Sequence, residues 1–369
     1  MMENTVTILH AADLHLDSAF EGLPEEKAAQ RRKELRLIPD AIARLAGSRS
    51  ADIVLLAGDM FDNDEPYRDS VEALFRALGS IKAPVFISPG NHDFYNLFSP
   101  YAKADIPENV HIFTSGSMES VSLPELGVRV WGAGFTAEHS PSLLDGFSTE
   151  KQNGVMDIAV VHGDAMNPAS PYGPVTAAQI SGSGLDYLAL GHSHGFSGLK
   201  RAGDTYYAWP GCCAGRGFDE LGEKGACIVA LSPVACELEF VPLGGRKYEI
   251  LSVDVTGSSA MEAVSAALPD GSENDIFRVV LTGETDHPPD LDAMHQALDG
   301  RTFFLQLRDS TTPKRDIWAC CGEDTLKGLF LSRLHGMLGT AGEDQRRKIE
   351  LAARYGLAAL ENGEAPTLL

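Results

Sequence analysis

Five short polar blocks carry most of the residues that could do chemistry, and each block follows an apolar run. They are Asp13-Leu14-His15, Gly58-Asp59, Gly90-Asn91-His92-Asp93, His162-Gly163-Asp164 and Gly191-His192-Ser193-His194. The blocks contain five of the chain's 11 histidines and offer oxygen and imidazole ligands without a thiolate. Such a ligand set suits hard to borderline divalent cations, namely Mn²⁺ or Fe²⁺, with Zn²⁺ as a further choice.

Each block alone has an ordinary structural explanation. A Gly-Asp pair after a strand is most often a turn, and Asp-x-His or His-Gly pairs arise from loop composition. A lone Gly-His-x-His block is as often a loop as a pair of ligands. The five blocks together, each at the end of an apolar run, favour a metal centre.

The elements that must position these blocks alternate between strand and helix patterns. We expect strands at residues 5–11, 51–59 and 83–91, and amphipathic helices at 25–47 and 68–80. Farther along the chain most runs resemble strands joined by short turns, which favours a second sheet packed on the first. The expected fold class is α/β (α+β), a four-layer helix–sheet–sheet–helix sandwich with two mixed sheets. Loops at the carboxyl ends of such strands bring polar side chains together.

The same patterns divide the chain into three expected parts. A catalytic domain spans residues 1–244, and a small α+β appendage spans 245–320 after a turn near LGGRKY. Two helices then form a C-terminal segment over residues 321–369.

Composition restricts the class of protein. A hydrophobic content of 44% allows a large core, and no apolar run reaches the roughly 20 residues that span a bilayer. The N-terminus lacks the basic region of a signal peptide, so we expect a cytoplasmic protein without membrane contact. The six cysteines form no C-x-x-C pair, which argues against a zinc ribbon and for reduced thiols. A net charge of −22 opposes simple binding of nucleic acid, which would need a metal centre, local basic loops or a basic partner.

The ordered blocks resemble the calcineurin-like metallophosphoesterase superfamily, whose pattern is D-x-H, G-D, G-N-H-[DE], H and G-H-x-H. The resemblance implies two divalent ions as cofactors, Mn²⁺ before Fe²⁺ or Zn²⁺. It implies that one ion is held by Asp13, His15 and His194. It implies that the other is held by Asn91, His162 and His192, and that Asp59 bridges the two. Two such ions can polarise a phosphoryl group and lower the pKa of a bridging water for in-line attack.

The resemblance gives His92 the role of protonating or stabilising the leaving oxygen. Asp62, three residues after the bridging aspartate, stands where phosphoprotein phosphatases have a histidine-pairing aspartate, so we expect an Asp62–His92 pair. We expect Asp93 to steady the loop and Gly90 to let the backbone turn sharply. Two further acidic residues are expected to support the site without binding metal, Asp17 and Asp164.

Three stretches narrow the resemblance: HAADLHLDSAFEGL, LLAGDMFD and WPGCCAGRGFDELGEKG. They are similar to bacterial SbcD-type DNA-repair exonuclease subunits, closest to the YhaO-like subgroup, with HAAD standing where HTAD is usual. The loop that contains Cys212 and Cys213 is therefore expected near the metals. Arg216 in this loop is either a phosphate contact or a structural arginine paired with Asp219 or Glu220, and the sequence leaves both open.

The resemblance also implies partners. The residues from 245 onward would form a capping domain that shapes a DNA groove, and the C-terminal helices would dock an SMC-like ABC ATPase. The apolar face of GLFLSRLHGML suits such docking, although packing on its own domain is the more economical explanation. A homodimer is compatible with the sequence.

Three functions are therefore in competition. The leading hypothesis is a two-metal-dependent phosphodiesterase that cleaves DNA as an exonuclease, with endonuclease action left open, in a DNA-repair complex with the ATPase. A small-molecule phosphoesterase acting on cyclic nucleotides or phosphomonoesters is the alternative, which the strong acidity favours. The third is a non-catalytic scaffold, and the complete ligand set together with His92 argues against it.

Overall fold

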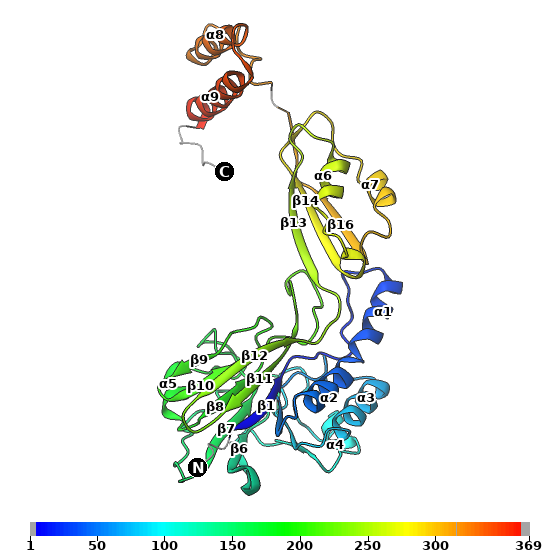
Figure 1. The fold of residues 1–369 in the computed structure, drawn as a ribbon, viewed down its shortest axis with the longest axis vertical. Coiled ribbons are helices and arrows are strands. Elements are labelled where there is room, and N and C mark those ends of the chain that lie inside the picture. Colours follow the sequence, from blue (N-terminus) through cyan, green and yellow to red (C-terminus); the bar gives the residue numbers. More distant parts are fainter. Residues whose placement is uncertain (1–4, 315, 363–369) are drawn as a thin grey trace. The chain divides into compact units, whose positions relative to one another are not determined.

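The computed structural model describes residues 5–314 and 316–362 (Figure 1). The chain divides into two compact units. The first unit contains the chain up to Leu251 together with residues 269–278 and 299–306. The second contains residues 252–268 and 279–298 and the chain from Leu307 onward. The expected division into 1–244, 245–320 and 321–369 stays a prediction.

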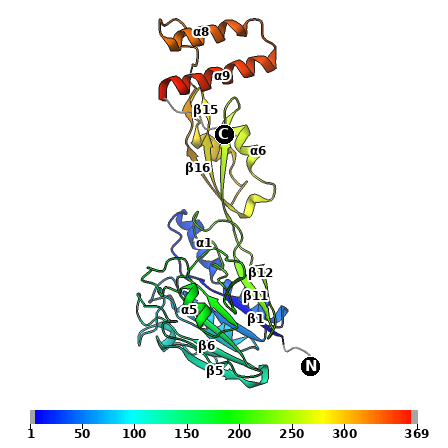
Figure 2. The ribbon, with the colours of Figure 1, turned by 90° about the vertical axis from the view of Figure 1, so that its left-hand side faces the viewer.

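Two six-stranded sheets form the body of the first unit (Figure 2). The strands of the first sheet are β1 (Val6–Ala11), β2 (Ile53–Leu56), β3 (Val85–Ile87), β4 (Val110–Ile112), β11 (Gly225–Leu231) and β12 (Cys236–Pro242). Their order is β12-β11-β1-β2-β3-β4, in which β1 to β4 are parallel and β11 and β12 are antiparallel.

The second sheet is also mixed. Its strands are β5 (Glu119–Leu123), β6 (Val128–Gly132), β7 (Met156–Val161), β8 (Tyr187–Leu190), β9 (Lys200–Ala202) and β10 (Thr205–Ala208). Their order is β5-β6-β7-β8-β10-β9, with β6, β7, β8 and β10 parallel and the two edge strands antiparallel. The α/β sandwich with two mixed sheets is thereby confirmed.

Helices cover the first sheet, and a mixture of helix and loop covers the second. The helices of the first unit are α1 (Glu25–Leu35), α2 (Ile38–Ser48), α3 (Arg68–Gly79), α4 (Pro100–Lys103) and α5 (Ala177–Gly182), with a 3₁₀ helix at Pro124–Leu126. Because alternate side chains of a strand point to opposite faces, Leu9 packs under α1 to α4 whereas Ile8 packs between the two sheets. Ala159 of β7 faces an outer layer formed by α5 and by loop residues such as Leu143.

The single helix expected over residues 25–47 is two helices. α1 ends at Leu35 and α2 begins at Ile38. Pro39 is the physical reason, because it lies in the first turn of α2, where a missing N–H breaks no helical hydrogen bond. In one continuous helix the same proline would remove an interior bond and clash with the preceding turn.

The chain beyond residue 244 adds a three-stranded sheet with the order β13-β14-β16. Its elements are β13 (Tyr248–Asp254), α6 (Ala260–Ala267), a 3₁₀ helix (Ser272–Asn274), β14 (Ile276–Thr282), α7 (Leu291–Ala297) and β16 (Phe304–Asp309). Two short strands pair in parallel beside them, β15 (Glu284–Thr285) and β17 (Thr312–Pro313). Each of the three longer strands begins among the residues of the first unit and ends among those of the second.

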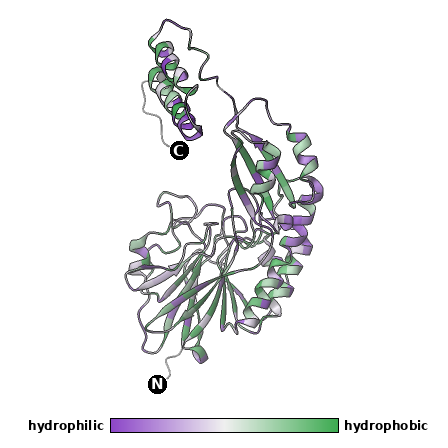
Figure 3. Cartoon of the chain, turned by 45° about the horizontal axis from the view of Figure 1, so that its top comes forward, coloured by the Kyte–Doolittle hydropathy of each residue, from purple (hydrophilic) through white to green (hydrophobic). Residues whose placement is uncertain are grey.

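Two helices complete the second unit, α8 (Leu326–Leu338) and α9 (Glu343–Asn362). They pack on each other around Leu331, Ala353 and Leu357, and both carry hydrophobic and hydrophilic residues along their length (Figure 3). Within the described ranges, no helix has the length and apolar character that crossing a membrane requires.

A buried histidine links the two sheets of the sandwich. His10 of β1 is fully buried, and its Nδ1 lies 2.9 Å from the Tyr187 hydroxyl on β8. Its Nε2 donates to the Leu190 carbonyl at 3.0 Å. Nδ1 therefore accepts from the tyrosine, which fixes one tautomer. Burial lowers the pKa of His10 to about 3.

We expect His10→Phe to reduce the dependence of stability on pH. The folded protein keeps His10 neutral while the unfolded chain binds a proton below its ordinary pKa of 6.5, so this group destabilises the fold as pH falls. The difference in unfolding free energy between wild type and variant should shrink by about 2 kcal/mol between pH 8 and pH 5. Urea unfolding of the metal-free proteins, followed by tryptophan fluorescence, measures it. A difference that stays constant with pH would contradict the assignment.

Candidate metal centre

The loops that carry the polar blocks meet at one edge of the sandwich. β1, β2 and β3 are parallel neighbours in the first sheet, and β7 and β8 are parallel neighbours in the second. The carboxyl ends of parallel neighbours lie at the same edge, so the residues that follow each strand converge. The structure accordingly brings together all seven residues expected to bind metal: Asp13, His15, Asp59, Asn91, His162, His192 and His194.

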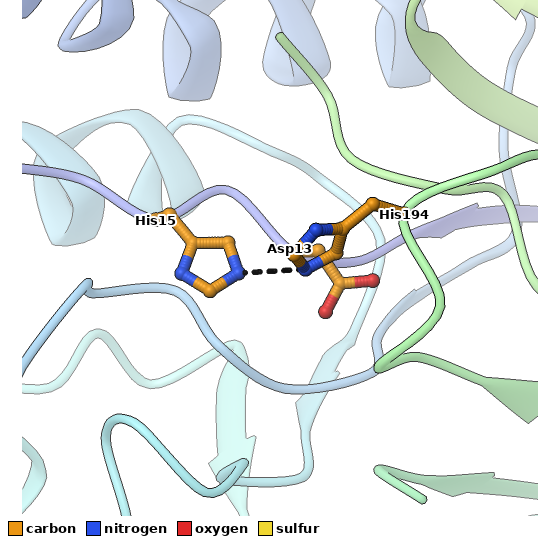
Figure 4. Close-up of side chains that lie close together, drawn as sticks. All are labelled: Asp13, His15 and His194. Carbon is orange, nitrogen blue, oxygen red and sulfur yellow. Dashed lines mark hydrogen bonds between the residues drawn. The ribbon is translucent and has the colours of Figure 1, made fainter. Parts of the chain in front are cut away.

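One group of ligand atoms combines Asp13, His15 and His194, whose candidate donor atoms all lie within 4.8 Å of one another (Figure 4). The Nε2 atoms of His15 and His194 are 3.2 Å apart. Asp13 and His15 are fully buried, whereas His194 is half-buried. This is the trio that the resemblance assigns to one ion.

A second group gathers around His162. Its Nε2 lies 3.0 Å from Asn91 Oδ1 and 3.3 Å from His192 Nδ1. The Oδ2 of Asp59 lies 3.4 Å from the same Nε2 and 3.7 Å from His15 Nε2, between the two groups. Asp59 therefore occupies the position expected of a bridging carboxylate.

The two carboxylates are held in the same way. One oxygen of each accepts a backbone N–H: Asp13 Oδ1 from His192 at 3.0 Å, and Asp59 Oδ1 from His92 at 3.0 Å. The other oxygen is left for the centre, and Asp13 Oδ2 is buried without a hydrogen-bond partner. Burial raises the pKa of Asp13 to about 7. For Asp59 burial also acts upward, but the His162, His15 and His92 rings lower its pKa to about 2.

These contacts fit bound cations better than a network of hydrogen bonds. His162 Nδ1 donates to the Ala57 carbonyl at 2.9 Å, so Nε2 of the neutral ring presents a lone pair. That lone pair faces a carboxylate oxygen, an amide oxygen and another imidazole nitrogen. Lone pairs that converge in a buried site repel one another unless a positive charge lies between them. The residues present therefore suit divalent ions.

The ligand-bearing loops contain strained backbone. Four expected ligands have left-handed φ angles, namely Asp13 (52°), His15 (46°), Asp59 (53°) and His192 (82°). Residues other than glycine at such angles cost about 1–3 kcal/mol each. Hydrogen bonds nevertheless join the loop after β1 to the loop after β2. Asp13 N donates to the Gly58 carbonyl at 3.0 Å, and His15 N donates to the Asp59 carbonyl at 2.9 Å.

His92 is held differently from our expectation. It is exposed, and its Nδ1 lies 2.9 Å from the main-chain carbonyl of Asp62 rather than from the carboxylate. The Asp62 carboxylate instead lies 3.0 Å from His15 Nδ1 and 3.0 Å from Arg216 Nη1. The expected contact between Asp62 and His92 is therefore made by the main-chain carbonyl of Asp62. The carboxylate of Asp62 contacts His15 instead. The resemblance to phosphoprotein phosphatases concerns the position of Asp62 in the sequence, which is the same whether its carbonyl or its carboxylate makes the contact.

The neighbouring acidic residues support loops. Asp93 is fully buried and accepts from the backbone N–H groups of Gly90 and Met60 at 2.7 and 2.6 Å and from the Tyr101 hydroxyl. Burial, with the Asp59 charge, raises the pKa of Asp93 to about 6. Asp93 therefore ties its loop to the loop after β2, as expected.

Asp17 and Asp164 have comparable roles. Asp17 accepts from the Tyr67 backbone at 2.8 Å and from the Ser70 hydroxyl. Asp164 accepts from the Met166 and Asn167 backbones and lies 3.7 Å from His192 Nε2. Neither belongs to the groups of converging ligand atoms.

Arg216 forms the ion pairs that one interpretation of the sequence foresaw. Its guanidinium contacts Glu220 at 2.6 Å and Asp62 at 3.0 Å. Glu220 is buried and also lies 2.8 Å from His194 Nδ1. Although burial raises the pKa of Glu220, its bonds to His194 and Arg216 hold that pKa well below the usual range. Sequence reasoning missed Glu220 as a support of His194, and its only signal was the four-residue spacing from Arg216.

Gly90 matters through close approach rather than through its φ angle, which is not left-handed. A Cβ at this position would lie 2.1 Å from Asp59 Oδ1 and 2.7 Å from the Asp59 backbone nitrogen. The chain does bend over residues 91–93, but Gly90 does not use the left-handed angles that favour glycine. Glycine is needed because the bridging carboxylate packs directly on the backbone.

We expect Gly90→Ala to lose bound metal, because the added methyl group displaces Asp59. Elemental analysis of purified protein after dialysis against Mn²⁺ should find fewer ions per chain than in wild type. Gly47→Ala is the matched control, since a Cβ there meets nothing within 4 Å and Gly47 lies in α2. Equal metal content in all three proteins would contradict the role given to Gly90.

Comparison with known proteins agrees with this geometry. Residues 6–196 match the family model described as calcineurin-like phosphoesterase. The chain is 30% identical over 284 residues to the uncharacterized metallophosphoesterase YhaO of Bacillus subtilis, covering 73% of this chain and 68% of that protein.

Solved structures with more distant similarity include TT1561 of Thermus thermophilus and a dimetal phosphatase from Danio rerio. The first is 15% identical and covers 65% of this chain and all of its own, with a TM-score of 0.40. The second is 12% identical and covers 65% of this chain and 96% of its own, with a TM-score of 0.43. The family match spans more than half of the chain and contains all five polar blocks, so the protein belongs to the calcineurin-like phosphoesterase family.

Proposed function

We propose that the protein is a two-metal phosphodiesterase that cleaves DNA and acts as the nuclease subunit of a complex with an SMC-like ABC ATPase. The observation that carries the phosphoester chemistry is the convergence of the seven ligand side chains beside an exposed histidine. His92 has its ring 4.9 Å from that of His15, so a group bound at the centre lies within its reach.

The residues divide the work of hydrolysis between them. Asp13, His15, His194, Asn91, His162, His192 and Asp59 would hold the ions. Bound divalent ions would supply positive charge that polarises the phosphoryl oxygens and lowers the pKa of an attacking water. The Asp62 carbonyl orients the ring of His92 through Nδ1, which leaves Nε2 to give a proton to the leaving oxygen.

DNA as the substrate is supported by the similarity of the loop from Trp209 to Gly225 to SbcD-type nucleases. Arg216 and Glu220 of this loop contact Asp62 and His194, and these contacts support the proposal. Two observations favour the runner-up, a small-molecule phosphoesterase. The net charge of −22 repels a polyanion, and Arg216 is engaged by two carboxylates.

Exposed apolar side chains on α8 support a partner protein. Leu326 is 72% exposed and Leu329 is 63% exposed, three residues apart on the same helix, while Leu331 packs inward on α9. Paired leucines on one helical face suit a groove or a partner helix. We propose that this face of α8 docks the ATPase.

His92→Ala should lower kcat for a bis-aryl phosphodiester and for linear DNA by about 10²–10⁴-fold with Mn²⁺, because proton transfer to the leaving group is lost. Metal content should stay at the wild-type value, which separates proton transfer from metal binding. His295→Ala, a histidine exposed on α7, is the control and should keep wild-type rates. A preference of the wild type for phosphomonoesters over diesters and DNA would overturn the nuclease proposal.

Replacing Leu326 and Leu329 together by Glu should weaken binding to an SMC-like ABC ATPase from the same genome by about tenfold or more, because buried apolar anchors dominate such interfaces. Phosphodiester hydrolysis by the isolated chain should be unchanged. Val234→Glu, at a site 68% exposed in the first unit, controls for the added charge. Unchanged affinity, measured by calorimetry, would reject this face of α8 as the docking site.

A further inference from the structure

Arg216 joins two carboxylates that lie behind the metal centre. Its Nη2 contacts Glu220 Oε1 at 2.6 Å and its Nε contacts the same oxygen at 3.1 Å. Its Nη1 contacts Asp62 Oδ1 at 3.0 Å, and its backbone N–H donates to Glu220 Oε2 at 2.8 Å. Only 16% of the Arg216 side chain and 3% of the Glu220 side chain are exposed. The donors of the guanidinium are therefore largely used within the protein.

Each of these carboxylates contacts one imidazole of the same group of ligands. Asp62 Oδ1 lies 3.0 Å from His15 Nδ1, and Glu220 Oε1 lies 2.8 Å from His194 Nδ1. A carboxylate beside Nδ1 favours the tautomer that has its hydrogen there, which leaves Nε2 as a metal ligand. For His15 the contact is one of charge at 3.0 Å, because the geometry gives its Nδ1 no hydrogen-bond partner. The two Nε2 atoms are the ones that approach to 3.2 Å at the centre.

Arg216 Nη2 also lies 3.0 Å from His194 Nδ1, within hydrogen-bond distance. Both nitrogens approach the same oxygen, Glu220 Oε1, at 2.6 and 2.8 Å. A His194 that binds metal through Nε2 would carry its hydrogen on Nδ1 and donate it to that oxygen. The closeness of the two nitrogens follows from the shared acceptor. Glu220 thus holds the arginine and the histidine in place together.

The other group of ligands is supported in a different way. His162 Nδ1 donates to a neutral backbone carbonyl, that of Ala57, at 2.9 Å. His192 Nε2 is 3.7 Å from Asp164 Oδ2, beyond hydrogen-bond distance. Loss of Arg216 would therefore disturb the orientation of His15 and His194 while leaving His162 and His192 supported as before.

We propose that Arg216 is a positioning residue: it clamps Asp62 and Glu220 and thereby orients His15 and His194 for one of the two metal positions. It does not act as a phosphate contact. The inference rests on the two-metal part of the proposed function and is independent of whether DNA is the substrate. Outer partners of this kind change metal affinity by about 10–100-fold when removed.

Titration of metal-free protein with Mn²⁺, followed by the electron paramagnetic resonance signal of free Mn²⁺, tests the clamp without an activity assay. Wild type should bind two ions. Arg216→Met should bind one ion with wild-type affinity and the other about 10–100-fold more weakly. Glu220→Gln should do the same, because its amide is a poorer acceptor for His194. Arg49→Met is the matched control, since Arg49 also pairs with a glutamate, Glu239, at 2.6 and 2.9 Å but on the surface.

Kinetics with a bis-aryl phosphodiester separates the two roles of Arg216. A clamp predicts that excess Mn²⁺ restores both kcat and KM of Arg216→Met towards wild type. A phosphate contact predicts a raised KM at every Mn²⁺ concentration together with two ions of normal affinity, and that result would overturn the proposal. Arg216→Lys keeps the positive charge but not the forked contact. Its affinity for the more weakly bound ion should therefore lie between those of wild type and Arg216→Met. Wild-type affinity in Arg216→Lys would also count against the clamp. An inactive wild type that binds two ions as described would refute the proposed function and leave the clamp standing.

Discussion

The structure around the metal centre depends on one electrostatic constraint, the burial of two carboxylates and several imidazole lone pairs that face one another. Asp13 and Asp59 are fully or almost fully buried, and each directs one oxygen into the same small volume. Imidazole nitrogens from both sheets point into that volume as well. Such an arrangement is costly in the absence of cations, which is seen in the raised pKa of Asp13. The strained φ angles and the close approach of Gly90 to Asp59 follow from the need to direct these groups inward.

The convergence of the polar blocks was predictable from the sequence, because parallel strands determine where the residues after them lie. The part of each residue in binding metal came from the family resemblance that the blocks carry. The alternation of apolar residues likewise predicted two sheets. The supports of the site were not predictable in this way. His10 reaches Tyr187, and Glu220 reaches His194, only once the two sheets are packed in register. No local pattern in the sequence reports such contacts.

Two errors show where local reasoning fails. The apolar periodicity of residues 25–47 continues through Pro39, and only the geometry of the proline separates α1 from α2. The carboxylate of Asp62 was expected at His92 because of the resemblance to phosphoprotein phosphatases, yet the backbone carbonyl makes that contact. The first expectation overlooked Pro39, whereas the second named the right residue and the wrong atom. Side-chain direction at a loop is set by its neighbours, and here Arg216 and His15 determine it.

Each group of ligands takes members from both sheets of the sandwich. Asp13 and His15 follow a strand of the first sheet and His194 a strand of the second, and the same division holds for Asn91 and His162. An ion bound at either position therefore joins the two sheets in addition to any role in hydrolysis. A ligand that binds only the folded state stabilises it by an amount that grows with its free concentration. Metal binding at these positions would therefore couple the resistance of this fold to unfolding to the supply of divalent ions, so that scarcity of the ion would favour loss of the protein as well as loss of its activity.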